Sequence, residues 1–237
     1  MRCSPESRDR RGGRLAVTIA PALLPGWLIV ATGLLMVVAL ALAARLAPWR
    51  AILEAPERQH VLLGSVVGLL LLWLGEIEVT DGVRLHLLAV TCTTMIIGLP
   101  LTLLAGTAAL AAQLSLQDVP LSALPTAWLP TVAVPAVVTR LLVHFLRRRA
   151  PGNLFLYLLG AGFAGGMLCV LATASTALGL FALMGRFELI ADALASATLV
   201  ALMMFPEGFL NGMLITAVTV FRPDLVKTFD DDYYLGS

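Results

Sequence analysis

The sequence predicts an all-α membrane protein, a polytopic bundle of about six to seven transmembrane helices. Of its 237 residues, 59% are hydrophobic and only 13% are charged. The mean hydropathy of +0.92 is higher than that of ordinary water-soluble domains. Several uncharged runs approach or exceed the about 20 residues that cross a hydrocarbon core. We therefore expect one transmembrane domain over residues 23–221, between an arginine-rich N-terminal tail, 1–22, and a polar, acidic cytoplasmic tail, 222–237.

The N-terminal tail is not expected to be a cleaved signal peptide. Its first fourteen residues, MRCSPESRDRRGGR, contain five arginines. The apolar run that begins at Leu15 is longer than the hydrophobic region of a signal peptide. The pair Arg10-Arg11 resembles a twin-arginine signal, but the residues around it fit that signal poorly.

The expected spans follow the apolar runs, and one run is too long for a single untilted helix. Five spans are expected at residues 23–46, 61–74, 122–146, 154–184 and 189–221. The central run, 85–116, is interrupted near its middle by Gly98 and Pro100. This interruption predicts two short helices or a re-entrant segment, and counting it as two gives about seven crossings.

Lysine and arginine residues near the span ends predict the orientation. Three groups fall on one side if there are seven crossings: Arg45, Arg50 and Arg58; Arg147 to Arg149; and Arg222 with Lys227. That side should be cytoplasmic, with the N terminus outside and the C terminus inside. The arginine-rich N-terminal tail opposes this arrangement, unless translation starts further along the chain or the first span is not a simple crossing.

One apolar segment, FPEGFLNGM at residues 205–213, contains an ionisable side chain. A charge at bilayer depth costs about 2.5 to 3.5 kcal/mol on insertion scales, so Glu207 is expected to face the protein interior, a partner or a water-filled cavity. Pro206 precedes it and removes a backbone donor, which predicts a bend. Asn211 follows four residues later and so shares a helix face with Glu207.

The pair Glu207 and Asn211 permits two interpretations. It is either a ligand or proton site, or a packing lock in which a protonated Glu207 and the Asn211 amide bond to the backbone of a neighbouring helix. Gly208 and Gly212 provide a smooth surface on which such a helix could lie. The pattern alone leaves both interpretations open.

Candidate metal ligands precede the central run. Glu76, Glu78 and Asp81 lie in GEIEVTDGVR, and His86 follows closely. Carboxylates and an imidazole are suitable ligands for a divalent transition metal. Their spacing matches no recognised metal motif, so a solvated loop with one interfacial histidine is the alternative. Glu207 is a further candidate ligand, deeper in the bundle.

Small residues mark two places where helices can approach closely. They are Ala39 with Ala43 in the first span, and the stretch GAGFAGG at residues 160–166. Such contacts are structural by default, but a subunit interface would have the same pattern. Ala39 and Ala43 are therefore a candidate docking face.

Enzyme activity is not expected. The sequence has no Gly-rich phosphate loop, zinc-protease helix motif or nucleophile elbow. Cys3, Cys92 and Cys169 have no ligand spacing and are interpreted as small, mostly core residues. No tightly bound cofactor and no nucleic-acid partner are expected, and membrane lipid surrounds the bundle.

Three stretches of the chain carry a family resemblance. They are GVRLHLLAVTCTTMIIGLPLTLLAG, PGNLFLYLLGAGFAGG and, most specifically, FPEGFLNGMLITAVTVFRPDLVKTFDDDYYL. They resemble bacterial energy-coupling factor transporter permeases, distant relatives of the CbiM/NikM cobalt and nickel substrate-binding subunits. The similarity covers roughly residues 25–235.

The resemblance implies both a metal ligand and partner subunits. In cobalt and nickel members the metal is held in part by an N-terminal Met-His segment and by a later histidine, whose counterpart by position is His86. The N-terminal motif is missing here, because residue 2 is Arg2 and no histidine precedes His60. The resemblance also implies a separate transmembrane coupling subunit and ATPase subunits.

Two functions follow from the sequence. The first is substrate capture in an energy-coupling-factor-type uptake system for a transition metal, in the bacterial inner membrane. Metal would enter near His86 and the acidic loop, and Glu207 would supply charge or a ligand. The alternative is a membrane scaffold or assembly factor without metal transport. In that case Glu207 and Asn211 lock helices together, and the tail at residues 229–234 binds a partner.

Overall fold

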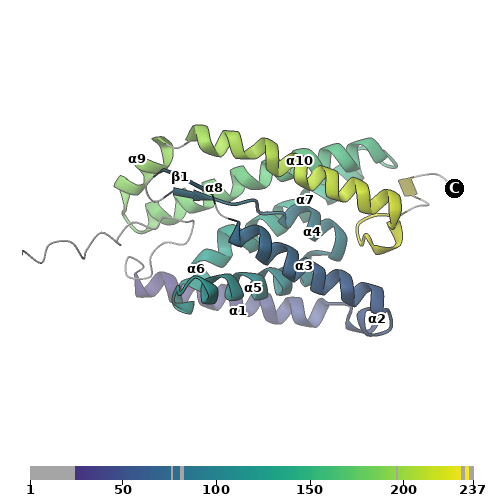
Figure 1. The fold of residues 1–237 in the computed structure, drawn as a ribbon, viewed down its shortest axis with the longest axis horizontal. Coiled ribbons are helices and arrows are strands. Elements are labelled where there is room, and N and C mark those ends of the chain that lie inside the picture. The colour runs from purple at the N-terminus through teal and green to yellow at the C-terminus, as the bar shows by residue number, and fades with distance from the viewer. Residues whose placement is uncertain (1–24, 76, 81–82, 196, 231–232, 235–237) are drawn as a thin grey trace, which may run out of the picture.

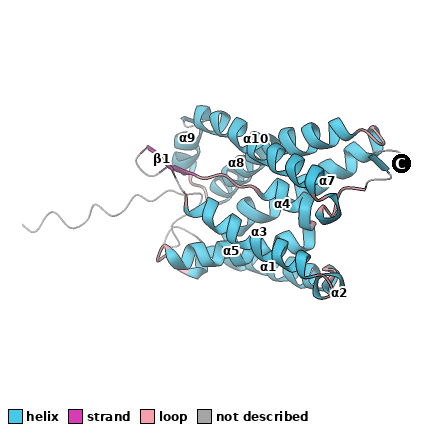
Figure 2. Ribbon diagram, turned by 45° about the vertical axis from the view of Figure 1, so that its right-hand side comes forward, coloured by secondary structure: helices cyan, strands magenta, loops and turns pink. Residues whose placement is uncertain are grey.

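The computed structural model describes residues 25–75, 77–80, 83–195, 197–230 and 233–234. Within these ranges the chain is a bundle of helices with one short hairpin (Figures 1 and 2). Six helical segments are long and apolar enough to cross a membrane: Gly26–Leu46 (α1), Pro56–Leu74 (α3), Leu99–Leu116 (α5), Leu121–Arg149, Leu156–Leu183 and Ala197–Phe221 (α10). The predicted polytopic helix bundle is confirmed.

Two of these six segments combine several types of helix. The fourth contains a 3-10 turn η2 (Leu121–Ala123), α6 (Leu124–Trp128), a π-helical turn η3 (Leu129–Ala133) and α7 (Val134–Arg149). The fifth joins the π-helical η4 (Leu156–Ala164) to α8 (Gly165–Leu183). Pro130 falls within η3, where its missing N–H is compatible with a local change in the hydrogen-bond pattern. The shorter elements are α2 (Trp49–Leu53), α9 (Phe187–Ala195) and η5 (Pro223–Leu225).

The central run contains one short and one long helix. The short helix α4 (Val90–Ile97) ends at Gly98, whose φ of 84° is in the region that favours glycine, and α5 begins directly afterwards. Pro100 lies in the first turn of α5, where its missing donor costs nothing. The interruption predicted at Gly98 and Pro100 is confirmed.

Between α3 and α5 the chain passes back through the bundle without a long helix. Strands β1 (Ile77–Thr80) and β2 (Val83–Leu85) pair antiparallel at the end of the bundle where α3 ends (Figure 1). Residues 86–89 then enter the bundle without regular structure and lead into α4. The last turn of α4 reaches the opposite end, where the amide of Lys227 donates to the carbonyl of Ile96 at 2.8 Å.

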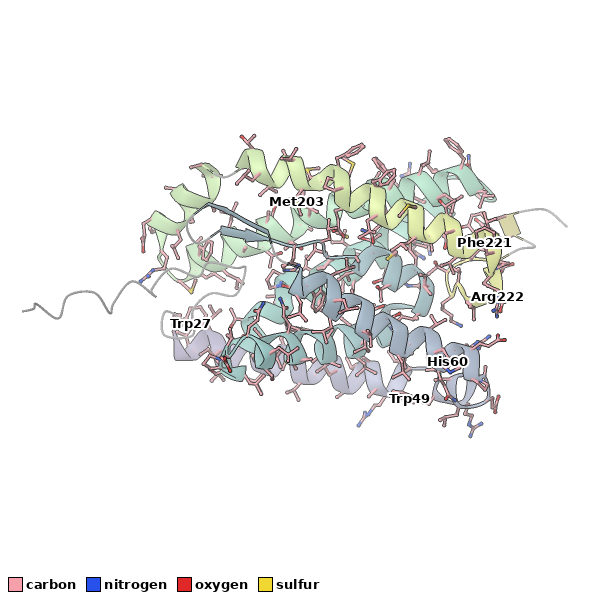
Figure 3. The ribbon with its side chains drawn as sticks, viewed as in Figure 1. Trp27, Trp49, His60, Met203, Phe221 and Arg222 are labelled. Atoms are coloured by element: carbon pink, nitrogen blue, oxygen red, sulfur yellow. The ribbon has the colours of Figure 1, made fainter. Side chains whose placement is uncertain are left out.

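The predicted cationic groups lie at one end of the bundle. Arg222 forms ion pairs with Glu57, at the start of α3, and with Asp224, at 2.7 and 2.9 Å. Hydrogen bonds from this guanidinium lower the pKa of the Asp224 carboxyl. Tyr233 donates its hydroxyl to the carbonyl of Arg147, at the end of α7, at 2.8 Å. Figure 3 shows Trp27 at the other end. The cytoplasmic assignment of the cationic end stays a prediction.

Small residues pack α10 tightly against the preceding span. A Cβ added at Gly162 would lie 2.6 Å from the side chain of Ile215, and one added at Gly208 would lie 2.7 Å from the carbonyl oxygen of Phe163. The close helix contact predicted for residues 160–166 is confirmed. In the N-terminal half, Ala43 is buried in the main core and Ala39 packs against it. Packing within the chain therefore involves both alanines, and the docking face stays a prediction.

Candidate functional site

The site is the set of contacts that holds α4, a helix that begins inside the bundle. The first N–H groups of any helix lack partners within that helix. At bilayer depth there is no water to bond them, so the protein itself must supply acceptors. Here the donors that need an acceptor outside the helix are the amides of Leu88, Ala89 and Cys92. Ala89, which precedes the helix, has a left-handed φ of 51°.

Glu207 on α10 accepts two of these amides. Its Oε2 lies 2.7 Å from the amide nitrogen of Leu88, and its Oε1 lies 2.8 Å from that of Ala89. The side chain is fully buried, with 1% of its surface exposed. A negative group is favourable at this position because the N-terminal end of a helix carries partial positive charge.

Asn211, one turn further along α10, completes the arrangement. Its Oδ1 accepts the amide of Cys92 at 2.7 Å. Its Nδ2 donates to Oε1 and to the backbone carbonyl of Glu207, both at 2.7 Å. The four-residue spacing therefore directs both side chains at the beginning of α4.

Of the two interpretations of this pair, the structure supports the packing lock, with one correction. All three partners of the Glu207 carboxyl are N–H donors, which suits a carboxylate that only accepts hydrogen bonds. A protonated Glu207 that donates to backbone, as the lock hypothesis supposed, does not match these contacts. The helix α10 continues through Pro206, which precedes the pair.

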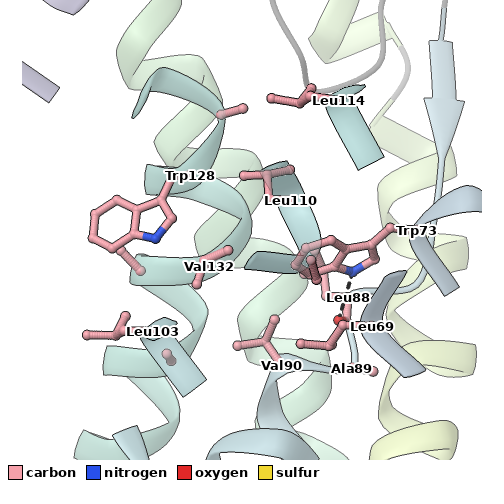
Figure 4. Close-up of a cluster of buried hydrophobic side chains, with 14 of the residues drawn as sticks. Leu69, Trp73, Leu88, Ala89, Val90, Leu103, Leu110, Leu114, Trp128 and Val132 are labelled. Atoms are coloured by element: carbon pink, nitrogen blue, oxygen red, sulfur yellow. Dashed lines mark hydrogen bonds between the residues drawn. The ribbon is translucent and has the colours of Figure 1, made fainter. Parts of the chain in front are cut away.

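Two residues that the sequence analysis missed hold the same segment from the other side. Trp73, at the end of α3, donates its indole N–H to the carbonyl of Leu88 at 3.1 Å (Figure 4). Gln113 on α5 donates to the carbonyl of Trp73 at 2.9 Å, and both side chains are buried. The sequence does contain a signal for Trp73 and Gln113, because each places a polar side-chain atom within an apolar run. The same signal identified Glu207.

The predicted metal ligands are only partly visible in the structure. His86 follows β2, is half-buried, and lies with its ring centroid 6.1 Å from that of Trp73. Glu78 lies in β1, opposite Arg84 in the register of the hairpin. Glu76 and Asp81 lie outside the described residues. Among the described residues, no group of three or more His, Cys, Asp or Glu side chains is placed to hold a metal ion.

The hairpin itself was not predicted. The acidic residues favoured a loop at 76–81, although an Asp81-Gly82 dipeptide between two short alternating runs is a strong signal for a hairpin. The hairpin ends at Leu85, so the irregular segment 86–89 begins at the end of the bundle where the hairpin lies.

These features define a polytopic membrane protein with an interrupted span whose irregular backbone is bonded inside the protein. Residues 18–225 match CbiM, the family described as the cobalt uptake substrate-specific transmembrane region. The chain belongs to this family, which confirms the resemblance. The family is a transport component, in agreement with the expectation that the chain is not an enzyme. Comparisons with curated proteins and with solved structures give no match.

The indole of Trp73 gives a first test of the site. We expect Trp73→Phe to lower the free energy of unfolding by about 1 to 2 kcal/mol, because the buried carbonyl of Leu88 loses its donor. The matched control is Trp49→Phe, whose indole bonds the carbonyl of Ala44 at an exposed position. Equilibrium unfolding in mixed detergent micelles measures both variants. Equal effects of the two substitutions would contradict a role for the Trp73 hydrogen bond.

Proposed function

We propose that this chain is the substrate-capture membrane subunit of an energy-coupling-factor-type uptake system for a transition-metal ion, cobalt or nickel in chemical type. It would act in the bacterial inner membrane with a separate transmembrane coupling subunit and ATPase subunits. The family membership over residues 18–225 supports a role in cobalt uptake. The chain has no nucleotide-binding motif of its own, so energy would come from the partners.

One observation carries the proposal beyond family membership: the bonded, irregular segment 86–89 in the interior of the bundle. Irregular backbone at membrane depth is typical of transporters, where it lies next to the path of the substrate. The segment begins at His86, directly after the hairpin, and an imidazole is a common ligand for transition metals. Metal would approach from the hairpin end, and His86 would be one ligand.

Glu207 does not serve as a ligand in this proposal. Both carboxylate oxygens accept short hydrogen bonds from N–H donors, so coordination of a cation would leave Leu88 and Ala89 without acceptors. Its contribution is to hold the segment that follows His86 in place.

Elemental analysis of purified protein tests the proposal. Wild type, His86→Ala and the control His60→Ala are equilibrated with cobalt, nickel, copper, zinc and manganese. We expect close to one ion of one metal per chain, reduced about tenfold or more in His86→Ala and unchanged in His60→Ala, whose side chain is exposed at the cationic end. Wild-type protein without metal above background, or equal binding by His86→Ala, would contradict the proposal.

The alternative is a scaffold or assembly factor that kept the fold without metal transport. It is favoured by the complete use of Glu207 and Asn211 in internal hydrogen bonds. Within the described part of the tail, Tyr234 is buried with 8% exposure, so its ring is used inside the chain. An unaltered melting temperature on addition of every metal, together with no bound metal, would favour this alternative.

A further inference from the structure

The C-terminal end of α4 is held by the segment that follows α10. We call residues 226–230 and 233–234 the C-terminal clip. The amides of Lys227 and Thr228 donate to the carbonyls of Ile96 and Met95 at 2.8 and 3.1 Å. The Thr228 hydroxyl also donates to Met95, at 2.8 Å. The clip therefore supplies the donors that the last carbonyls of α4 lack within their own helix.

Aromatic rings seat the clip on the cationic end of the bundle. Tyr157 packs against Phe229 and Tyr234 with centroid distances of 5.7 and 4.9 Å, and its hydroxyl lies 2.7 Å from that of Thr228. The guanidinium of Arg147 lies 4.9 Å from the ring centroid of Tyr233, a cation–π contact. These contacts resemble a small core, so the clip binds at a specific position on the bundle. We call this position, formed by Tyr157 and Arg147, the seat of the clip.

The clip also lies against two glycine turns. Gly98, between α4 and α5, would bring a Cβ to 3.3 Å from the side chain of Lys227. Gly152, with a φ of 70°, would bring one to 3.1 Å from the carbonyl oxygen of Tyr233. Gly98 is the joint at which α4 can change direction relative to α5, and the clip contacts it directly.

The short helix depends on these contacts more than a long helix would. With eight residues, α4 is well below the length at which a helix is stable alone. Glu207 and Asn211 bond its N-terminal end, and the clip bonds its C-terminal end. Both sets of hydrogen bonds come from one continuous stretch, residues 207–228, so α10 and the clip hold α4 as a unit.

One side of α4 has space beside it. A groove of about 480 Å³ runs between α3 and α10, and Cys92, Thr93 and Ile96 of α4 form part of its lining. The opposite wall includes Gly64 and Gly68 of α3, which have no neighbouring atom within 4 Å of an added Cβ. A released α4 could thus shift into the groove without displacing packed side chains.

We propose that the C-terminal clip is a release device through which the cationic end of the protein controls α4. When the clip leaves its seat, the carbonyls of Met95 and Ile96 lose their donors, α4 loosens about Gly98, and the backbone around Cys92 opens. The same release would act on residues 86–89, because they are continuous with the first turn of α4. The device operates on the fold and does not depend on which substrate, if any, the protein binds.

The thiol of Cys92 reports on this release, because it is 4% exposed in the seated state. The measurement is the rate of its reaction with N-ethylmaleimide, in full-length protein in which Cys3→Ser and Cys169→Ser leave it as the single cysteine. Thr228→Val removes the hydroxyl that bonds Met95 and Tyr157. We expect Thr228→Val to raise the rate of reaction at Cys92 about tenfold. This factor corresponds to the loss of two hydrogen bonds that hold the clip in place.

Two controls separate release from general loosening. Thr176→Val removes a comparable hydroxyl that bonds only within α8, and it should leave the rate within about twofold. A second reporter, Leu180→Cys in a chain whose own cysteines are replaced, lies in a separate core cluster with α1 and α9. Its reaction rate should not change with Thr228→Val.

The proposal is overturned if Thr228→Val leaves the rate at Cys92 unchanged, or if the two reporters accelerate equally. Should Thr228→Val not fold, Tyr157→Phe removes only the hydroxyl that contacts Thr228 and keeps the ring in its seat. It should raise the Cys92 rate severalfold with no effect at position 180, and an unchanged rate in this variant would also overturn the proposal.

Discussion

Glu207→Leu is expected to lower the free energy of unfolding by at least about 3 kcal/mol. The substitution introduces an apolar side chain of similar size and leaves the buried amides of Leu88 and Ala89 without acceptors. Each buried donor left unsatisfied costs about 1 to 3 kcal/mol. The amide of Asn211 also loses its bond to Oε1, so three donors are affected by a single change.

Equilibrium unfolding in mixed micelles measures this effect, with Glu188→Leu as the control. Glu188 forms an ion pair with Arg186 at 2.9 Å, but 61% of its side chain is exposed, so its loss should change stability by less than about 1 kcal/mol. Glu207→Gln should fall between the two, because an amide keeps one acceptor and turns a donor towards another donor. Stability of Glu207→Leu equal to that of Glu188→Leu would contradict the lock.

The transmembrane segments could be predicted because their signal is local. Length and hydropathy located the long helices, although the last span begins at Ala197 and not at 189, after the separate helix α9. Gly98 with Pro100 located the break, since this signal is read within a few residues. The pair Glu207 and Asn211 was also found locally, from polar side chains four residues apart in an apolar run. Sequence reasoning thus found the half of the lock that has distinctive side chains.

The other half of the lock could not be predicted, because it is backbone. Glu207 meets the amides of Leu88 and Ala89, which lie 119 and 118 residues away in the chain. Every residue except proline carries a backbone N–H, so the residue types at positions 88 and 89 do not distinguish these two donors. The pattern therefore showed that Glu207 needs a partner, and left open whether that partner is an ion, a proton or a peptide group.

The tail illustrates a packing that composition did not predict. Its aromatic and acidic residues favoured partner binding in the scaffold alternative, which stays a prediction. In the structure Phe229 and Tyr234 pack on Tyr157 of the same chain. Aromatic residues favour burial against any complementary surface, and composition does not distinguish a surface of the same chain from that of another protein.

Gly208→Ala is expected to destabilise the protein by about 1 to 3 kcal/mol through overpacking. The added Cβ would lie 2.7 Å from the carbonyl oxygen of Phe163 and 2.8 Å from the side chain of Met167. The first contact is with backbone, so α10 must move away from η4 to relieve it. Because Glu207 precedes Gly208, this movement also disturbs the carboxylate bonds to Leu88 and Ala89.

Gly64→Ala is the matched control, because Gly64 lies in a helix and an added Cβ there meets no atom within 4 Å. Alanine is favoured over glycine in a helix by about 1 kcal/mol at either position, so the difference between the two variants isolates the clash. We expect Gly64→Ala to be neutral or stabilising and Gly208→Ala to unfold first in a micelle titration. If both substitutions stabilise equally, the close approach of α10 and η4 is not what holds Glu207 against the start of α4.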